Sequence, residues 1–356
     1  MFHIQISPGY SLNQIHKKEK AALKEVGSMR YQPRYGNGMQ GVDQKPRRAE
    51  MQKKLAFDDI WAANLAVPEP IEACVHSLIK RAVWEFASSP AIRSWDGDLT
   101  YQQLDQVSTR LAHQLIGVGV KPRTKIALCF EKTWLTPVVM VALMKAGAVS
   151  IALDISQPRE RLRIIMAQAC PSFILSSSAN EELARQLGMA EVVVVDRQML
   201  SEETTMACSL PAVSPSDTLC VFLSPDGGAG AAVTHREFSS AITYQQETLG
   251  LTHNSRVVDL ESHATRVGWY SLLVLTCGGC LCIPSLDGLR DSIESSIIAL
   301  QADSVLLASE IGRTTPEYAK ISHLVRPRHV ADVVAPSDVT LKQTCGTAAV
   351  FINPVT

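Results

Sequence analysis

The feature of this sequence that most constrains its fold is a regular alternation of short apolar runs with helix-like stretches, which begins near residue 57. Residues 126–130 form an apolar run typical of a buried strand, and residues 136–145 follow with helical composition. Residues 149–153 are again strand-like, residues 158–169 helical, and residues 172–175 strand-like. Strands that alternate with helices of this length indicate parallel sheets covered by helices. The sequence therefore predicts an α/β fold with mostly parallel sheets and flanking helices.

The same alternation continues along the chain. Further strands are expected at residues 192–195, 219–223, 257–260, 281–283 and 304–307. Further helices are expected at residues 179–187, 236–249, 269–276 and 292–300. Local signals agree with this pattern. Thr100 and Gln103 have the spacing of a capping box, and Thr136 is expected to cap a helix whose first residue is Pro137.

The first 54 residues differ from the rest, because they carry eleven Lys and Arg against four Asp and Glu and show no apolar period. We interpret residues 1–56 as a flexible basic lead-in and linker with one helix at residues 12–26, and residues 57–356 as the folded domain. A nucleic-acid-binding tail is the alternative, but most charge runs are simply solvated.

The overall charge and composition also argue against two classes of partner. The net charge is -1 and aromatic residues make up 6% of the chain, so neither nucleic acid nor an anionic membrane is an expected partner. The N-terminus has no apolar core typical of a secretion signal, which favours a cytoplasmic location.

The nine cysteines are an odd number and lie mostly in apolar runs, which indicates reduced, buried thiols and not a disulfide framework. Cys277, Cys280 and Cys282 have the close spacing of a metal site, but no second cluster of His or Cys lies near them in the sequence. Buried structural thiols are the favoured interpretation, and no metal ligand is predicted.

A glycine-rich turn after the strand at 219–223 is the best candidate for a ligand site. In parallel sheets, ligands bind beyond the carboxyl ends of the strands, and small residues let backbone N–H groups approach an anion. The candidate phosphate-binding residues are Ser224, Asp226, Gly227, Gly228 and Gly230. The sequence has no Lys or Arg between Ser224 and Thr234, so composition alone favours an ordinary surface turn over a phosphate loop.

Several longer motifs, in the right order, identify the chain as resembling a known family. The segments WAANLAVPEPIEACVH (61–76), DGDLTYQQLD (96–105), LCFEKTWLTPVVMVALMKAGAVSIALDISQPRERL (128–162) and GGCLCIPS (278–285) resemble the adenylation (AMP-binding) domain of fungal nonribosomal peptide synthetases, which belongs to the adenylate-forming superfamily. The resemblance covers roughly residues 57–356.

The resemblance implies a fold, a reaction and partners. The fold would be the large N-terminal subdomain of adenylate-forming enzymes, without the small C-terminal subdomain. The reaction would be activation of an amino acid by ATP and Mg²⁺ to an aminoacyl-adenylate, followed by loading onto a carrier-bound phosphopantetheine thiol in secondary-metabolite biosynthesis. The partners would be ATP, an amino acid and other synthetase domains; no phosphopantetheine site is expected in this chain.

The phosphate loop departs from the family pattern, which resembles T/S-S-G-S/T-T-G-x-P-K-G. Ser224 and Gly228 match that pattern, but Ala231 stands where the lysine would be. The following Thr234 and His235 resemble the start of the family's next helix, and His235 is expected to cap or line the loop. Loss of a cation beside a phosphate would weaken ATP binding.

The amino-acid pocket departs as well. Family members that bind α-amino acids carry a Phe-Asp pair, and Ala264 and Thr265 occupy those positions here. Thr265 and Trp269 are the candidate substrate-binding residues, although a core position is the favoured interpretation of Trp269. Asp259 and Glu261 lie a few residues upstream and could replace the missing aspartate only after a shift.

The sequence stops just before the position of the family's Gly-Pro-Thr-Glu motif, so the catalytic lysine of the C-terminal subdomain is expected to be missing and no catalytic residue is predicted. The expected function is therefore that of an adenylation-domain fragment with weak or lost activity. The alternative is a non-catalytic interaction module or a degenerate remnant of a larger synthetase.

Overall fold

The computed structural model describes residues 69–188, 190–201, 209–223, 230–308, 325–332 and 348–354. The chain divides into two units, Met1–Ala66 and Val67–Thr356, and all described residues belong to the second. The predicted lead-in, its helix at residues 12–26 and the predicted boundary after residue 56 lie outside the described residues.

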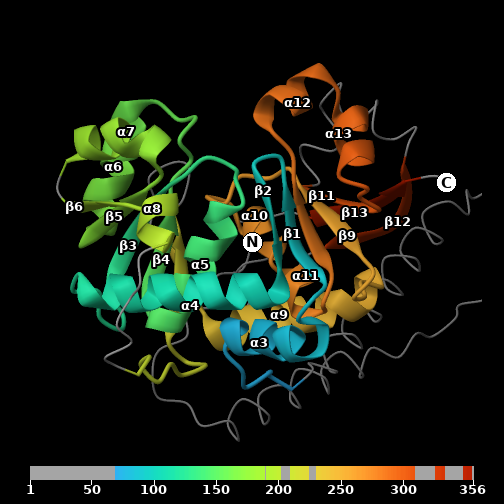
Figure 1. The fold of residues 1–356 in the computed structure, drawn as a ribbon, viewed down its shortest axis with the longest axis horizontal. Coiled ribbons are helices and arrows are strands. Elements are labelled where there is room, and N and C mark those ends of the chain that lie inside the picture. Colours follow the sequence, from blue (N-terminus) through green and yellow to red (C-terminus); the bar gives the residue numbers. More distant parts are fainter. Residues whose placement is uncertain are drawn as a thin grey trace, which may run out of the picture. The chain divides into compact units, whose positions relative to one another are not determined.

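A six-stranded sheet occupies the left of Figure 1. Its strands, in spatial order, are β6 (Glu191–Val194), β5 (Phe173–Ser176), β3 (Lys125–Cys129), β4 (Val149–Ala152), β7 (Thr218–Phe222) and β8 (Ala231–Thr234). Neighbouring strands pair in parallel except β7 and β8, which are antiparallel. The parallel strands therefore end at one common edge of the sheet, where ligands bind in folds of this type.

A seven-stranded sheet lies to the right in Figure 1. Its strands, in spatial order, are β12 (Val325–Asp332), β13 (Ala348–Pro354), β11 (Ser304–Ala308), β9 (Arg256–Asp259), β10 (Cys280–Ile283), β1 (Pro90–Ser94) and β2 (Gly97–Thr100). The central strands β11, β9, β10 and β1 pair in parallel, and the pairs toward both edges are antiparallel.

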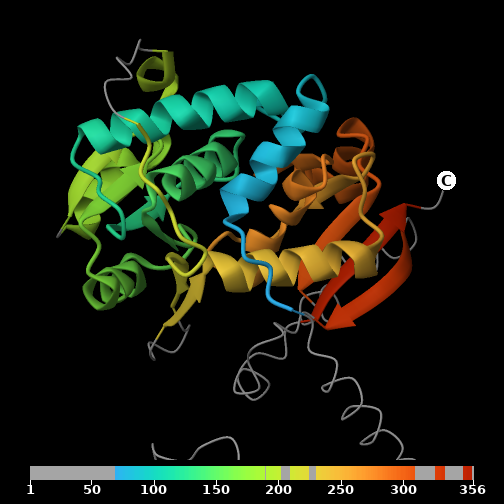
Figure 2. The ribbon, with the colours of Figure 1, turned by 90° about the horizontal axis from the view of Figure 1, so that it is seen from below.

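Helices connect and cover these strands. They are α3 (Val75–Phe86), α4 (Tyr101–Gly117), α5 (Leu135–Ala146), α6 (Arg159–Ala169), the 3₁₀ turn η1 (Ser178–Asn180), α7 (Glu181–Leu187), α8 (Arg197–Ser201), α9 (His235–Leu249), α10 (Arg266–Tyr270), α11 (Leu273–Thr276), α12 (Leu286–Asp291) and α13 (Ile293–Ala299). Figure 2 shows α3 lying between α4 and α9, both of which it contacts. No helix in the described part of the chain is both long and apolar enough to cross a bilayer.

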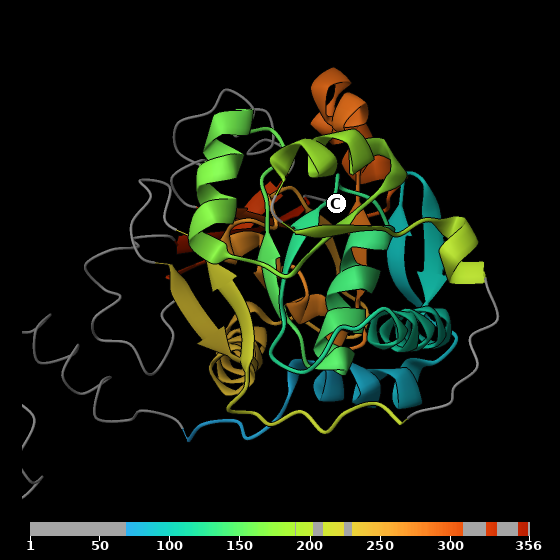
Figure 3. The same ribbon diagram turned by 90° about the vertical axis from the view of Figure 1, so that its left-hand side faces the viewer.

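Strand β3 is apolar along almost its whole length because helices cover both faces of its sheet (Figure 3). Ala127 and Cys129 face a core shared with α6 and α7, while Ile126 and Leu128 face the core shared with α5. Alternation of side chains along a strand places these two pairs on opposite faces. A strand with two buried faces has a continuous run of apolar residues, which is the pattern that the sequence shows at residues 126–130.

Lys145, a buried lysine at the end of α5, links this helix to α4. Lys145 is 7% exposed, and its Nζ donates hydrogen bonds to Asp105 Oδ1 at 2.7 Å, to Ser108 Oγ at 2.8 Å and to Thr109 Oγ1 at 2.8 Å. Burial lowers the pKa of Lys145, although Asp105 favours its charged form. This arrangement satisfies a buried charge with three side-chain oxygens, so the role of Lys145 here is structural.

The predicted fold class is confirmed, and most predicted elements lie within one or two residues of their observed bounds. The capping box at Thr100 and Gln103 is also confirmed. The predicted cap of α5 is wrong, because the helix begins at Leu135 and Thr136 Oγ1 donates to Glu131 O at 2.7 Å instead. The predicted helix at residues 269–276 is wrong in extent, because the segment is divided into α10 and α11. Between these helices, Ser271 Oγ donates a hydrogen bond to Gly268 O at 2.6 Å.

The connection between β7 and α9 differs from the expected strand, turn and helix. Strand β8 stands between the glycine-rich turn and the helix and pairs antiparallel with β7. Helix α9 therefore begins beside the amino end of β7, where His235 N donates to Asp217 O at 3.0 Å. The turn follows the carboxyl end of β7, so the positive end of the α9 dipole is not at the turn.

Candidate functional site

A pocket of about 220 Å³ opens where strand ends of the two sheets meet. It lies at the carboxyl ends of β3, β4 and β9, which is the edge where ligands bind in parallel α/β folds. The residues that line it are Leu128, Phe130, Glu131, Lys132, Thr136, Ala152, Leu153, Asp154, Ile155, Ser156, Leu260, Ser262, His263 and Leu286.

A buried ion pair lies beside this pocket and joins the two sheets. Asp259, the last residue of β9, is completely buried. Lys132, which follows β3, places its Nζ 2.8 Å from Asp259 Oδ1 and donates to Asp259 O at 3.1 Å. His263 places its Nε2 3.0 Å from Asp259 Oδ2. Both carboxylate oxygens therefore already face a nitrogen of the protein itself.

These contacts determine the charge of Asp259. Burial alone would raise the pKa of Asp259, but the positive charge of Lys132 and the contact with His263 lower it to about 2. The carboxylate is thus ionised and neutralised internally. Neither Asp259 nor Glu261, which is also buried, lines the pocket.

This pKa shift gives a pH prediction with a defined sign. The pKa of Asp259 is lower in the folded chain than its unfolded value near 3.8, so the stability it contributes is present above pH ~4 and is lost as the pH falls through ~2. We expect the free energy of unfolding in urea to fall by about 1 kcal/mol between pH 5 and pH 3 because of this group. Asp259→Asn should lose this pH-dependent part of the free energy of unfolding. If the free energy of unfolding fell equally between pH 5 and pH 3 in the unaltered chain and in Asp259→Asn, the prediction would be contradicted.

The carboxylates that do line the pocket are engaged by neighbouring side chains. Glu131 Oε2 accepts from Ser177 Oγ at 2.5 Å and also from Asn180 Nδ2. Asp154 Oδ1 accepts from the backbone N–H of Ser156 at 3.2 Å and from its hydroxyl at 2.7 Å. Asp154 is therefore a turn-forming residue, as the sequence indicates.

The glycine-rich turn is described only at its end. The predicted phosphate-binding residues Ser224, Asp226, Gly227 and Gly228 lie outside the described residues. Gly230 immediately precedes β8, and a Cβ there would lie 2.9 Å from Phe222 O and 2.8 Å from Leu223 Cδ2. A side chain at this position would therefore clash with β7, which accounts for the glycine.

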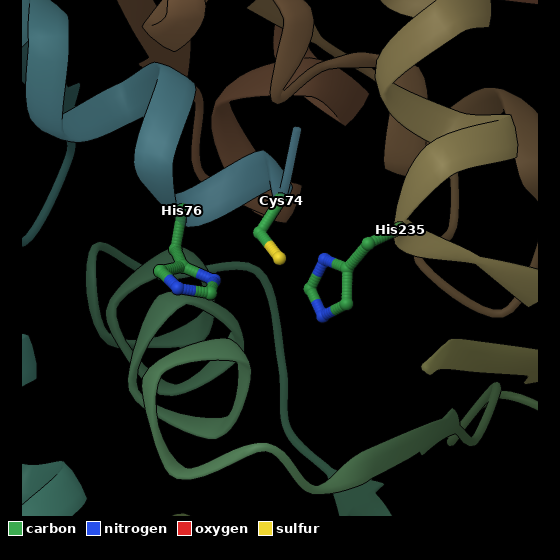
Figure 4. Close-up of side chains that lie close together, drawn as sticks. All are labelled: Cys74, His76 and His235. Atoms are coloured by element: carbon green, nitrogen blue, oxygen red, sulfur yellow. The ribbon is translucent and has the colours of Figure 1, made fainter. Parts of the chain in front are cut away.

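His235 begins a helix, as the resemblance implies, but strand β8 separates it from Gly230 at the end of the glycine-rich turn. It is the first residue of α9, and the four-residue strand β8 separates it from the turn by roughly 13 Å. His235 is buried instead beside Cys74 and His76 at the start of α3 (Figure 4). The role of His235 in capping or lining a phosphate loop stays a prediction, because residues 224–229 lie outside the described part of the chain.

The two predicted substrate-binding residues perform local structural roles, and neither lines the pocket. Thr265 caps α10, because its Oγ1 accepts from Gly268 N at 3.2 Å and donates to Ser262 O at 2.8 Å. Trp269 is 1% exposed, and its ring meets Phe222 and Phe238 edge-on with centroid distances of 6.0 Å. The interpretation of Trp269 as a core residue is the one that the structure supports.

Sequence reasoning missed Lys132, His263 and Glu131, all of which line the pocket. A weak signal was present for each, since Glu131 and Lys132 directly follow a buried strand, and His263 lies one helical turn after Asp259. The pairing of Lys132 with Asp259 spans 127 positions and depends on how the two sheets meet. No local pattern in the sequence encodes such a contact.

Comparison with known sequences identifies relatives over most of the chain. A family model described as "AMP-binding enzyme" matches residues 79–301. A nonribosomal peptide synthetase of Aspergillus campestris, ungA', is 37% identical over 301 residues, covering 82% of this chain and 3% of that protein. The synthetase ungA of Aspergillus violaceofuscus is 41% identical over 242 residues, covering 66% of this chain and 2% of that protein. The chain therefore spans only a small part of the length of these relatives.

Solved structures share the fold at low sequence identity. The structure of VinN with L-aspartate matches with a TM-score of 0.57 and 21% identity, covering 64% of this chain and 61% of VinN. The nonribosomal peptide synthetase FmoA3, in its α-methyl-L-serine-AMP bound form, matches with a TM-score of 0.59 and 20% identity, covering 79% of this chain and 31% of FmoA3.

Proposed function

This chain belongs to the AMP-binding enzyme family, among the nonribosomal peptide synthetases of fungi, and on that premise we propose that it is an amino-acid adenylation unit of weakened activity. The reaction would join an amino-acid carboxylate oxygen to the α-phosphorus of ATP, while the α–β phosphate bond breaks and pyrophosphate leaves. The aminoacyl-adenylate would then load a carrier-bound thiol for secondary-metabolite synthesis. Neighbours of this fold whose structures contain L-aspartate or an aminoacyl-AMP support the substrate class.

The position of the nucleotide would be the edge shared by the glycine-rich turn and the pocket. We propose that the turn with Ser224, Gly227, Gly228 and Gly230 approaches the phosphates through its backbone N–H groups. Such a turn positions the nucleotide, but its sequence supplies no side-chain cation to the phosphates. The pocket carboxylates Glu131 and Asp154 are already hydrogen-bonded, so Mg²⁺ would enter with the ATP phosphates and would not occupy a preformed protein site.

The observation that carries the proposal of weakened activity is the internal neutralisation of Asp259. The family pattern expects a carboxylate to pair with the substrate ammonium, and Thr265 stands at that position here. Asp259 and Glu261 are the two acidic residues a few positions upstream that could have replaced it after a shift, and Lys132 and His263 already contact both carboxylate oxygens of Asp259. Releasing it for a substrate would leave Lys132 without its counter-charge, which is costly in a buried setting.

Titration calorimetry with ATP and Mg²⁺ distinguishes this proposal from a non-catalytic interaction module. We expect ATP to bind with a dissociation constant well above 1 μM, because the turn lacks charge-assisted bonds that are each worth about 1.5–3 kcal/mol. Complete absence of ATP binding up to several millimolar would favour the interaction module, since that function needs no nucleotide. Binding tighter than 1 μM would contradict the weakening.

A further inference from the structure

We propose that Cys74, His76 and His235 form a binding site for a zinc ion, which fastens the start of α3 to the start of α9. One potential ligand atom from each side chain lies within 4.8 Å of the others. Figure 4 shows the three side chains converging from α3 and α9. Imidazole and thiolate are ligand types that zinc prefers, and mixed sets of three protein ligands with a water molecule in the fourth position occur in zinc proteins.

The spacing requires only small movements. A tetrahedral zinc with ordinary bond lengths holds its sulfur and nitrogen ligands roughly 3.3–3.6 Å apart. Contraction from 4.8 Å or less therefore needs displacements on the order of 1 Å, which side-chain rotations supply. Cys74 is the N-cap residue of α3 and has an extended backbone, whereas His76 lies in the first turn of the helix. This change of backbone direction lets both side chains face the same point.

The hydrogen bonding of the cluster leaves one ligand atom without a partner and holds the other two in contacts that zinc would replace. His76 Nδ1 is buried and has no hydrogen-bond partner among the described residues. Cys74 Sγ donates to Val213 O at 3.3 Å, and the N–H of Val75 donates to His235 Nδ1 at a long 3.3 Å. Zinc would replace the thiol proton of Cys74, which leaves to solvent, and the fourth coordination position would belong to a water molecule. Burial of Cys74 and His235 excludes most competing solvent.

The site lies apart from the pocket, since none of its three residues lines that pocket. It would link the chain segment before α3 to the junction of β8 and α9. These two parts lie far apart in the sequence: Val75 and His235 are separated by 160 positions. Its role would be to stabilise the contact between the start of α3 and the start of α9. The inference therefore does not depend on whether the chain adenylates an amino acid.

The test uses the full chain, stripped of metal with a chelator and then titrated with Zn²⁺ or Co²⁺ alone. We expect one ion per chain, a thiolate-to-cobalt charge-transfer absorption, and release of about one proton per zinc bound. Cys74→Ser should abolish the absorption, and His76→Gln should weaken zinc binding at least tenfold. Cys170, which is exposed, provides the matched control, and Cys170→Ser should bind zinc as the unaltered chain does.

Metal-free circular dichroism and melting curves decide whether each variant is folded before its binding is interpreted. His76 is only partly buried, so His76→Gln serves if Cys74→Ser does not fold. Zinc should raise the melting temperature of the unaltered chain and leave that of His76→Gln nearly unchanged. The proposal is overturned if zinc does not bind, or if either folded variant binds zinc as tightly as the unaltered chain.

Discussion

Replacement of Lys132 by methionine should lower the free energy of unfolding by about 3–5 kcal/mol, because it leaves a buried carboxylate without its cation. Asp259 has no exposed side-chain surface, and the side chain of Lys132 is 12% exposed. The pair also joins the segment after β3 to the end of β9, so its loss affects the contact between the two sheets. Urea unfolding would measure the effect, and the melting temperature should fall by roughly 10 °C.

Two further variants make this prediction specific. Adding Asp259→Leu to Lys132→Met should recover most of the loss, since replacing both members of a buried ion pair by apolar residues is often neutral. Lys121→Met, at an exposed lysine before the same strand, should change stability by less than about 0.5 kcal/mol. If Lys132→Met were as mild as Lys121→Met, Asp259 would not depend on Lys132 and would be available to a substrate.

Replacement of Ala231 by lysine should strengthen ATP binding about 10- to 100-fold, which corresponds to one charge-assisted hydrogen bond to a phosphate. Ala231 is the first residue of β8, directly after the turn, and its register partner is Phe222. Paired residues of antiparallel strands share a face of the sheet, so the new side chain would start on the face where Phe222 meets Trp269. Calorimetry with ATP and Mg²⁺ would measure the gain.

The neighbouring alanine is the matched control for this experiment. Ala232 pairs with Val221 and projects from the opposite face of β8, so Ala232→Lys adds the same charge in the wrong direction. It should change ATP affinity by less than about threefold, as expected of an exposed and screened charge. Equal gains from both variants would indicate general electrostatic attraction, and no gain from Ala231→Lys would count against the turn as the phosphate site.

The sequence predicted the fold well where one local rule decides the structure. The capping box at Thr100 encodes a helix start directly, since its hydroxyl accepts the N–H of Gln103 three positions on. The apolar run at residues 126–130 encodes a strand with both faces buried. Gly147 ends α5 in a left-handed conformation, with φ 69°, that glycine adopts without strain.

The sequence predicted the candidate site less well, because tertiary contacts build it. Strand β8 has four residues, two of them alanine, so neither its length nor its composition indicates a strand. Because of this strand, His235 lies beside the amino end of β7, where its N–H donates to Asp217 O. Likewise, the acidic pattern at Asp259 and Glu261 is compatible with a substrate counter-charge, and only the approach of Lys132 shows that Asp259 is already paired.

ATP–pyrophosphate exchange with the full chain, assayed against each of the common amino acids, tests the central proposal most directly. The sequence of the phosphate turn supplies no cation, and the buried carboxylate of Asp259 is bound to Lys132 and His263. The chain should therefore exchange pyrophosphate at, or only slightly above, the rate of a reaction without enzyme. Exchange that saturates with one amino acid and turns over at ~1 s⁻¹ or faster, as in ordinary enzymes, would contradict the proposal, because the chain would then possess a fully working ammonium partner and phosphate site.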